Sequence, residues 1–140
     1  MILLKEFRKA SQVVYASVYY DEQSRCIKDV WTGSFGTQQN FRDVLVYVAS
    51  EIQRRKALKW LADLRLMVGS FDSSSEWIKY EITPKVLSSG LLLEAVVLPQ
   101  DAFAKLSAKE TVTKINKFEL RQFEDIQLAE KWLRETVLIH

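Results

Sequence analysis

Residues 57–65 read ALKWLADLR, an apolar run of strand length that lacks the capping residues at which helices begin and end. A run of this kind is typical of a strand that is buried on both faces, as in the middle of a parallel sheet. We therefore expect a strand from Ala57 to about Asp63 that lies inside a sheet, with a neighbouring strand on each side. This expectation requires further strands on both sides of it in the chain.

Two strands and a helix are expected before this central strand. The β-branched and aromatic runs SQVVYASVYY (residues 11–20) and CIKDVWT (residues 26–32) are separated by the polar DEQSR, a pattern that predicts a hairpin. Within residues 38–56, apolar side chains recur at the spacing of one helix face, and Thr37 stands at the position of an N-cap. The basic residues 54–56 close this helix, where the helix dipole favours cations even without a bound phosphate or RNA.

Three helices and two strands are expected after the central strand. A helix should run from Ser73 to about Thr83, because the residue before Pro84 is biased away from the helical conformation. The remaining predicted elements are a strand at 90–99, a helix at 101–110, a strand at 115–123 and a helix at 125–137. The order β-β-α-β-α-β-α-β-α predicts an α/β fold with a mixed β-sheet covered by helices, in which right-handed crossovers make the later strands parallel.

Composition bounds the number of domains and the kinds of partner. A chain of 140 residues that is 48% hydrophobic is long enough for one core, so we assign residues 1–140 to a single domain. A net charge of +2 lacks the strongly basic footprint of a nucleic-acid-binding protein, and the apolar start MILL is too short for a signal peptide or a membrane span. Neither nucleic acid nor a membrane is therefore an expected partner. Cys26 is the only cysteine, which fits a reducing compartment and makes the cytoplasm the expected location.

The residue inventory contains no recognisable catalytic constellation. The only histidine is His140, the last residue, and with a single cysteine it cannot supply a zinc ligand set. None of the four glycines belongs to a phosphate-binding or dinucleotide-binding loop. Asp63, at the end of the central strand, fits either a ligand site at the carboxyl edge of the sheet or a cap on a loop amide. We expect a non-enzymatic protein with no catalytic residues, metal or cofactor.

Five short stretches, distributed over nearly the whole chain, carry a family resemblance. They are VWTGSF after the hairpin, KWLADLR in the central strand, SSEWI at the second helix, GLLLEAVVLPQDAFA and FEDIQLAEKWL. Together with the element order they resemble the SpoIIAA-like branch of the sulfate-transporter and anti-sigma-factor-antagonist (STAS) family. The resemblance implies a single STAS-like domain with a regulatory or protein-interaction role, an unidentified protein partner and self-association as a homodimer.

The stretch FDSSSEW fits two interpretations. Members of the antagonist family carry Asp-Ser-Ser-Gly at the start of the second helix, and the first serine accepts phosphate. The resemblance therefore implies that Asp72 matches the aspartate, Ser73 the phosphate acceptor and Ser74 the second serine, while Ser75 replaces the glycine. The same residues fit a capping box, in which Ser73 accepts a hydrogen bond from the Glu76 amide and Glu76 bonds back to the Ser73 amide.

Two functions follow as hypotheses. The first is a STAS-like regulatory or protein-interaction module, with Tyr47 on the otherwise polar side of the first helix as part of a partner surface. The second is a carrier or sensor of a small apolar or lipid-like ligand, because the family is related in fold to lipid carriers. Tryptophans on four different elements are expected in the core or at its rim, where they could line a cavity. They are Trp31, Trp60, Trp77 and Trp132.

Overall fold

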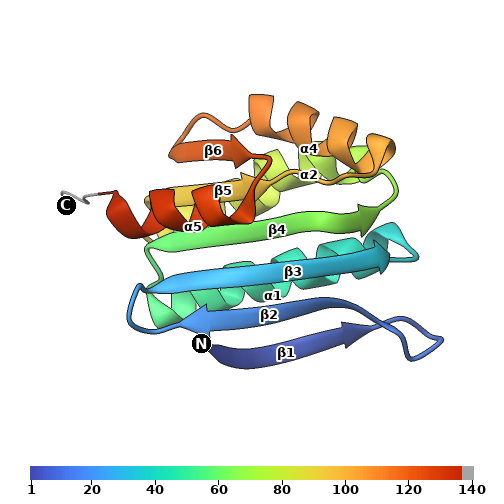
Figure 1. Cartoon of the computed structure of the whole chain (residues 1–140), viewed down its shortest axis with the longest axis horizontal. Helices are drawn as coiled ribbons and strands as arrows, with labels where there is room; N and C mark the ends of the chain where they lie inside the picture. The colour runs from blue at the N-terminus through green and yellow to red at the C-terminus, as the bar shows by residue number, and fades with distance from the viewer. Residues whose placement is uncertain (137–140) are drawn as a thin grey trace.

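The sheet has six strands that follow one another in chain order, as the computed structural model of residues 1–136 shows (Figure 1). They are β1 (Ile2–Arg8), β2 (Val14–Asp21), β3 (Cys26–Ser34), β4 (Lys59–Val68), β5 (Leu93–Val97) and β6 (Glu119–Phe123). The first three strands form an antiparallel meander, whereas β3 to β6 run parallel to one another. The predicted mixed sheet of an α/β fold is therefore confirmed.

The predicted order was wrong at the N-terminus, because it lacked β1. This strand lies at the edge of the sheet and pairs only with β2. Phe7 is its one buried side chain, and the polar Lys5, Glu6 and Arg8 are exposed. An edge strand that turns most of its side chains to water carries neither an alternating nor a continuous apolar pattern, so periodicity could not identify it.

The central strand lies where the sequence predicted it. β4 pairs with β3 on one side and β5 on the other, and residues 59–63 have partners on both. The strand continues beyond Asp63 to Val68, however, and this second half pairs with β3 alone. Leu66 in this half is 57% exposed, because neither β5 nor a helix reaches it.

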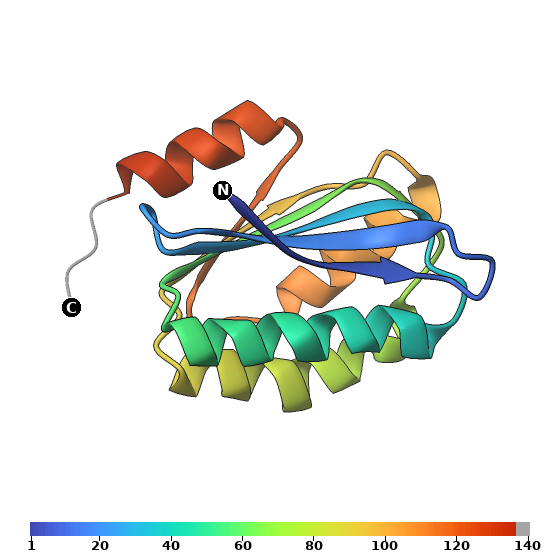
Figure 2. The same cartoon turned by 90° about the horizontal axis from the view of Figure 1, so that it is seen from below.

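Four helical segments cover the sheet within residues 1–136. They are α1 (Gln38–Arg55); a continuous segment of η1 (Asp72–Ser74), α2 (Ser75–Trp77), η2 (Ile78–Ile82) and α3 (Thr83–Ser88); α4 (Ala102–Thr113); and α5 (Ile126–Glu135). Below, residues 72–88 are called the α2–α3 segment. α1, the α2–α3 segment and α4 lie on one face of the sheet, and α5 lies on the other (Figure 2). Val137, the predicted end of the last helix, and His140 lie outside the described residues.

The helix starts follow side-chain caps in most cases. Thr37 caps α1 as predicted, since its hydroxyl accepts a hydrogen bond from the Asn40 amide at 3.1 Å. Asp101 and Asp125 cap α4 and α5 in the same way.

The α2–α3 segment does not end at Thr83, where the sequence predicted a stop. Its η2 part is a π-turn, in which the Thr83 amide donates a hydrogen bond to the carbonyl of Ile78. In a regular α-helix the ring of Pro84 would collide with the carbonyl four residues earlier, that of Tyr80. The wider turn relieves this collision, so the helix continues to Ser88.

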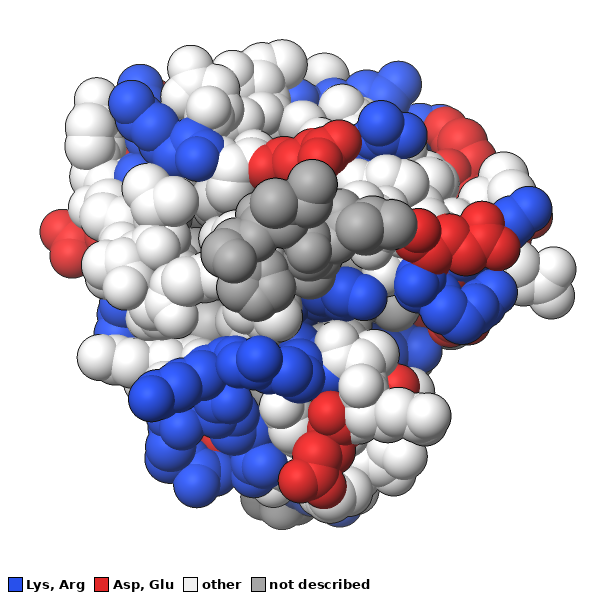
Figure 3. Space-filling model, turned by 90° about the vertical axis from the view of Figure 1, so that its left-hand side faces the viewer, with Lys and Arg blue, Asp and Glu red and all other residues white. Residues whose placement is uncertain are grey.

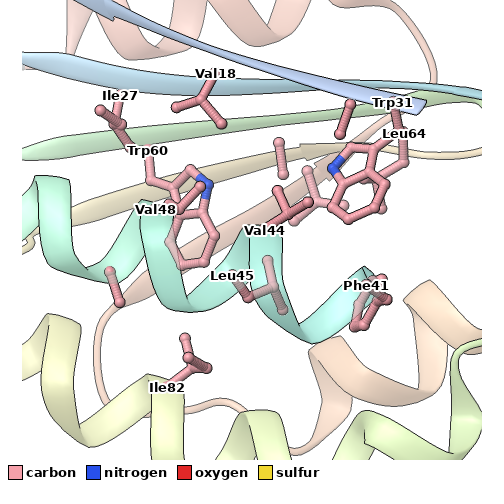
Figure 4. Packing of buried hydrophobic residues seen from close by; sticks show 14 of the residues in the cluster. Val18, Ile27, Trp31, Phe41, Val44, Leu45, Val48, Trp60, Leu64 and Ile82 are labelled. Atoms are coloured by element: carbon pink, nitrogen blue, oxygen red, sulfur yellow. The ribbon is translucent and has the colours of Figure 1, made fainter. Parts of the chain in front are cut away.

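The apolar core is divided by the sheet into two unequal clusters. The large cluster lies between the sheet and α1, the α2–α3 segment and α4, and Figure 4 shows part of it. The small cluster lies under α5 and includes Leu61, Leu93 and Leu133. All five residues of β5 are buried because helices cover both of its faces. Within residues 1–136, no helix combines the length and the apolar character that crossing a bilayer requires.

Candidate ligand cavity with two buried carboxyl groups

Two carboxyl groups lie inside the large apolar cluster, on the strands that flank β4. Asp29 on β3 is 1% exposed, and Glu94 on β5 is 5% exposed. Strand alternation places Asp29 on the same face as its buried neighbours Ile27 and Trp31, toward the helices rather than toward α5. Buried carboxyl groups are rare unless they are paired, so each of the two requires an explanation.

The Asp29 carboxyl is held by two indole rings. Trp31 Nε1 donates to Asp29 Oδ2, and Trp60 Nε1 donates to Asp29 Oδ1, each at 2.6 Å. In Figure 4 the ring nitrogens of the two tryptophans face the space between the rings. Burial raises the pKa of Asp29 to about 6, although both indole hydrogen bonds act in the opposite direction. Asp29 is therefore a positioned hydrogen-bond acceptor in an apolar environment.

Glu94 has no comparable partner. No side-chain hydrogen bond to its carboxyl is found within residues 1–136, and burial, followed by the charge of Asp29, raises its pKa well above the usual value. No fully enclosed side-chain nitrogen or oxygen in the described residues lacks a hydrogen bond. The Glu94 oxygens must therefore have open space beside them, and a cavity provides that space.

This cavity lies between the sheet and the helices of the large cluster and has a volume of about 60 Å³. Asp29 and Glu94 line it together with five aromatic rings, two threonines and aliphatic side chains, and none of the lysines, arginines or other basic side chains in residues 1–136 does. The aromatic rings belong to Trp31, Phe41, Trp60, Phe71 and Phe118. Two of the four tryptophans therefore line a cavity, while Trp77 and Trp132 are partly buried against the two apolar clusters.

The π-turn of the α2–α3 segment forms part of the cavity wall. Ile78, Ile82 and Thr83, which flank or belong to this turn, all line the cavity. π-turns occur frequently at functional sites, because the widened turn positions side chains that a regular helix could not. The π-turn therefore lies where the α2–α3 segment borders the cavity that contains the two carboxyl groups.

The outer end of the cavity is formed by the end of α4 and the connection to β6. Val112, Ile115 and Phe118 line it there and are partly exposed. A surface groove of about 310 Å³ lies next to it, lined by lysines and by Tyr80 and Leu87, and Thr83 belongs to both the groove and the cavity. This groove, between the α2–α3 segment and residues 114–117, thus shares the Thr83 part of its wall with the cavity.

The predicted serine site lies at the start of the α2–α3 segment, between Phe71 and Ile78, which both line the cavity. The capping box expected there was wrong, because the start of the α2–α3 segment has no side-chain cap and Glu76 instead pairs with Lys114 at 2.8 Å. The Ser73 hydroxyl is exposed and takes part in no hydrogen bond described for residues 1–136, while its carbonyl accepts from Arg42.

The side chains of Ser74 and Asp72 form hydrogen bonds that hold the start of the α2–α3 segment to neighbouring helices. Ser74 is fully buried, where its hydroxyl donates to Gln38 and accepts from Arg42 Nε, so it ties the segment to α1. Asp72 accepts a hydrogen bond of 2.6 Å from the hydroxyl of Ser107 on α4. Of the three predicted residues, only Ser73 presents a free hydroxyl to solvent.

Tyr47 lies in a different environment from the one predicted. Its ring contacts Phe7 on β1 edge to face, with ring centroids 5.6 Å apart, and the Lys5 ammonium lies 5.3 Å from its ring centroid. Tyr47 is half-buried beside β1, a strand that the sequence did not predict, so it is less exposed than expected. Its part in a partner surface stays a prediction.

Asp63 and the basic run 54–56 have structural partners. Asp63 is buried within β4 rather than at its end, and both of its oxygens bind Arg65, at 2.8 and 2.9 Å. Figure 3 shows lysines and arginines gathered on the end of the molecule where α1 ends. There Arg54 and Arg55 both bind Glu51 at 2.8 Å, which agrees with a role in closing the helix.

Sequence reasoning missed Asp29 and Glu94, although both carry a signal. Each is a single carboxylate inside an apolar run, in CIKDVWT and in LLLEAVV. Within the described residues, no group of three or more histidine, cysteine, aspartate or glutamate side chains is arranged to hold a metal. Comparison of the chain with protein-family models, with curated proteins and with solved structures finds no match.

Proposed function

We propose that this chain is a non-enzymatic binding protein that carries or senses a small, mostly apolar ligand in the cavity between the sheet and the helices. The observation that carries the proposal is the buried Glu94 carboxyl, which borders open space and has no side-chain hydrogen-bond partner among residues 1–136. A buried polar group without a hydrogen bond costs about 1–3 kcal/mol. A ligand that bonds to Glu94 would recover this energy when it fills the cavity.

The size of the cavity limits what can bind without rearrangement. Its volume of about 60 Å³ is several times the roughly 10–15 Å³ of accessible space that one water molecule requires. A long lipid chain does not fit, whereas a molecule of a few non-hydrogen atoms does. A larger ligand would have to extend past Ile115 and Phe118 into the adjoining groove.

Two measurements test this proposal. Native mass spectrometry of freshly purified protein should show a bound ligand as added mass that is lost on denaturation. If the protein is purified without its ligand, solution NMR with a set of small molecules should reveal at least one that shifts the Trp31 and Trp60 indole signals saturably. Ala108→Val fills the cavity and should abolish either effect. A clean polypeptide mass together with no binder in the set would reject the proposal.

A STAS-like regulatory or protein-interaction module is the second proposal. It is supported by the β4 strand at the centre of a mixed sheet and by the exposed hydroxyl of Ser73 at the start of the α2–α3 segment. Phosphate on Ser73 would add negative charge close to Arg42, which already contacts the Ser73 carbonyl at 3.1 Å. Phosphopeptide mapping of protein from its native cell, with a partner pull-down by wild type and Ser73→Asp, tests it. An unmodified Ser73 with equal recovery of partners would reject the switch.

A further inference from the structure

We infer that the ligand of the cavity carries a positively charged group of the protonated-amine class, which binds between Asp29 and Glu94. This inference rests on the proposed binding function, and it specifies the chemistry of the ligand. It follows from the charges that line the cavity, from the aromatic rings beside them and from the space available.

The charges around the cavity have one sign. Among the described residues, Asp29 and Glu94 are the only ionisable ones that line it, and no lysine, arginine or histidine of that part of the chain does. The charge of Asp29 also acts on Glu94 and disfavours its ionisation. A cation placed between the two would offset both the desolvation of the carboxylates and their mutual repulsion. An anionic ligand would instead add a third negative charge to an apolar space.

The aromatic rings complement the same kind of ligand. The N–H groups of Trp31 and Trp60 are both used by Asp29, so these rings offer the cavity their π-faces and edges rather than hydrogen-bond donors. Phe41, Phe71 and Phe118 add rings with no polar atom. An ammonium group near the face of an aromatic ring is attracted by about 0.5–2 kcal/mol, with the larger values in desolvated sites.

The oxygen count favours an organic cation over a metal ion. Within residues 1–136, the side-chain oxygens that line the cavity are those of the two carboxyl groups and the hydroxyls of Thr83 and Thr111. Calcium takes about six to eight oxygen ligands, and magnesium needs an octahedral shell, whereas both Asp29 oxygens already accept indole N–H hydrogen bonds. An ammonium group on one or two carbons fits the volume and uses both the carboxyls and the apolar wall.

The test compares a cationic probe with its neutral analogue. Uniformly ¹⁵N-labelled protein is titrated with ethylammonium chloride, with ethanol and with sodium chloride at the same ionic strength, and the Trp31 and Trp60 indole N–H signals are followed. The expected result is saturable binding of ethylammonium, at least about tenfold tighter than that of ethanol, a difference of about 1.4 kcal/mol. Sodium chloride should cause no saturable shift.

Variants locate the effect at the carboxyl groups. Glu94→Gln keeps the size of the side chain but cannot ionise beside a bound cation, so ethylammonium affinity should fall about tenfold or more while ethanol affinity stays unchanged. Glu22→Gln, in the exposed turn between β2 and β3, should leave both affinities as in the wild type. Equal shifts with sodium chloride and ethylammonium, or an unchanged ethylammonium affinity in Glu94→Gln, would overturn the inference.

The outcomes separate this inference from the proposal beneath it. If ethanol binds as tightly as ethylammonium, and Ala108→Val abolishes both, the cavity is a binding site for neutral ligands and only the cationic inference fails. If neither probe nor any other small molecule shifts the indole signals, both the cationic inference and the proposed binding function fail.

Discussion

Replacement of Asp29 by asparagine should remove a defined part of the pH dependence of folding. The pKa of Asp29 is raised by burial from 3.8 to about 6. The folded protein therefore holds this proton more tightly than the unfolded chain does. The associated stability is fully present below about pH 3.8 and is lost as the pH rises through about 6. A shift of about 2 pH units at 1.36 kcal/mol per unit corresponds to a loss of about 3 kcal/mol.

Asp29→Asn cannot ionise, so its free energy of unfolding should lack this fall of about 3 kcal/mol between about pH 4 and pH 7. The amide NH₂ would face one indole N–H, which adds a constant cost of about 1–3 kcal/mol at every pH. The variant is thus expected to be less stable than wild type at about pH 4, and the difference should shrink or reverse by about pH 7. Asp63, whose charge acts on Asp29, and Glu94, on which the charge of Asp29 acts, remain in wild type and variant alike.

The assay is urea unfolding followed by tryptophan fluorescence at closely spaced pH values. Glu22→Gln serves as the control, because it removes an exposed carboxylate and should keep the wild-type slope. Parallel pH profiles of wild type and Asp29→Asn, within about 0.5 kcal/mol, would show that Asp29 does not retain its proton in the folded state and would refute the reasoning.

Three further changes have distinct expected outcomes. Ser74→Ala should lower the free energy of unfolding by about 1–2 kcal/mol in urea denaturation, because a buried hydroxyl bonded to two side chains is lost, whereas Ser73→Ala should change it by less than about 0.5 kcal/mol; equal effects would contradict the absence of a Ser73 cap. Ala108→Val should be tolerated within about 1 kcal/mol because it extends into the cavity, while Ala49→Val on the fully packed face of α1 should cost about 1–3 kcal/mol; similar losses by thermal unfolding would argue against a real cavity. Tyr47→Glu should lower the free energy of unfolding by at least about 1 kcal/mol in the same assay, since it removes the contact with Phe7. An unchanged melting temperature would show that this contact does not stabilise the fold.

The parts of the fold that the sequence predicts are those with a strong local pattern. ALKWLADLR predicts the central strand because a strand covered on both faces must be apolar on both. β1 was missed because it is covered by little more than Phe7, and the helix through Pro84 was missed because a π-turn depends on the surrounding structure rather than on the local sequence.

The sequence shows some of the residues that line the cavity but not that they lie together. The sequence places Asp29 and Glu94 in apolar runs, but the two are 65 positions apart, and only the pairing of β3, β4 and β5 brings them to one face of the sheet. The hydrogen bonds of Trp31 and Trp60 to one carboxyl follow from the register of β3 and β4, in which Ile27 is opposite Trp60. Register between distant strands cannot be read from periodicity, which reports only which face a residue occupies.

The π-turn also sets the rotational phase of the helix that contains it. Ile78, Ile82 and Val86 are buried at intervals of four residues. On a regular α-helix, at about 100° per residue, such a row would drift around the axis by about 40° at each step. A wider turn reduces this drift, so the row stays aligned along the sheet. Removal of a single residue between Ile78 and Pro84 would turn this stretch into a regular α-helix, in which the ring of the proline would again collide with the carbonyl four residues earlier. Length in this stretch is therefore constrained more tightly than side-chain identity.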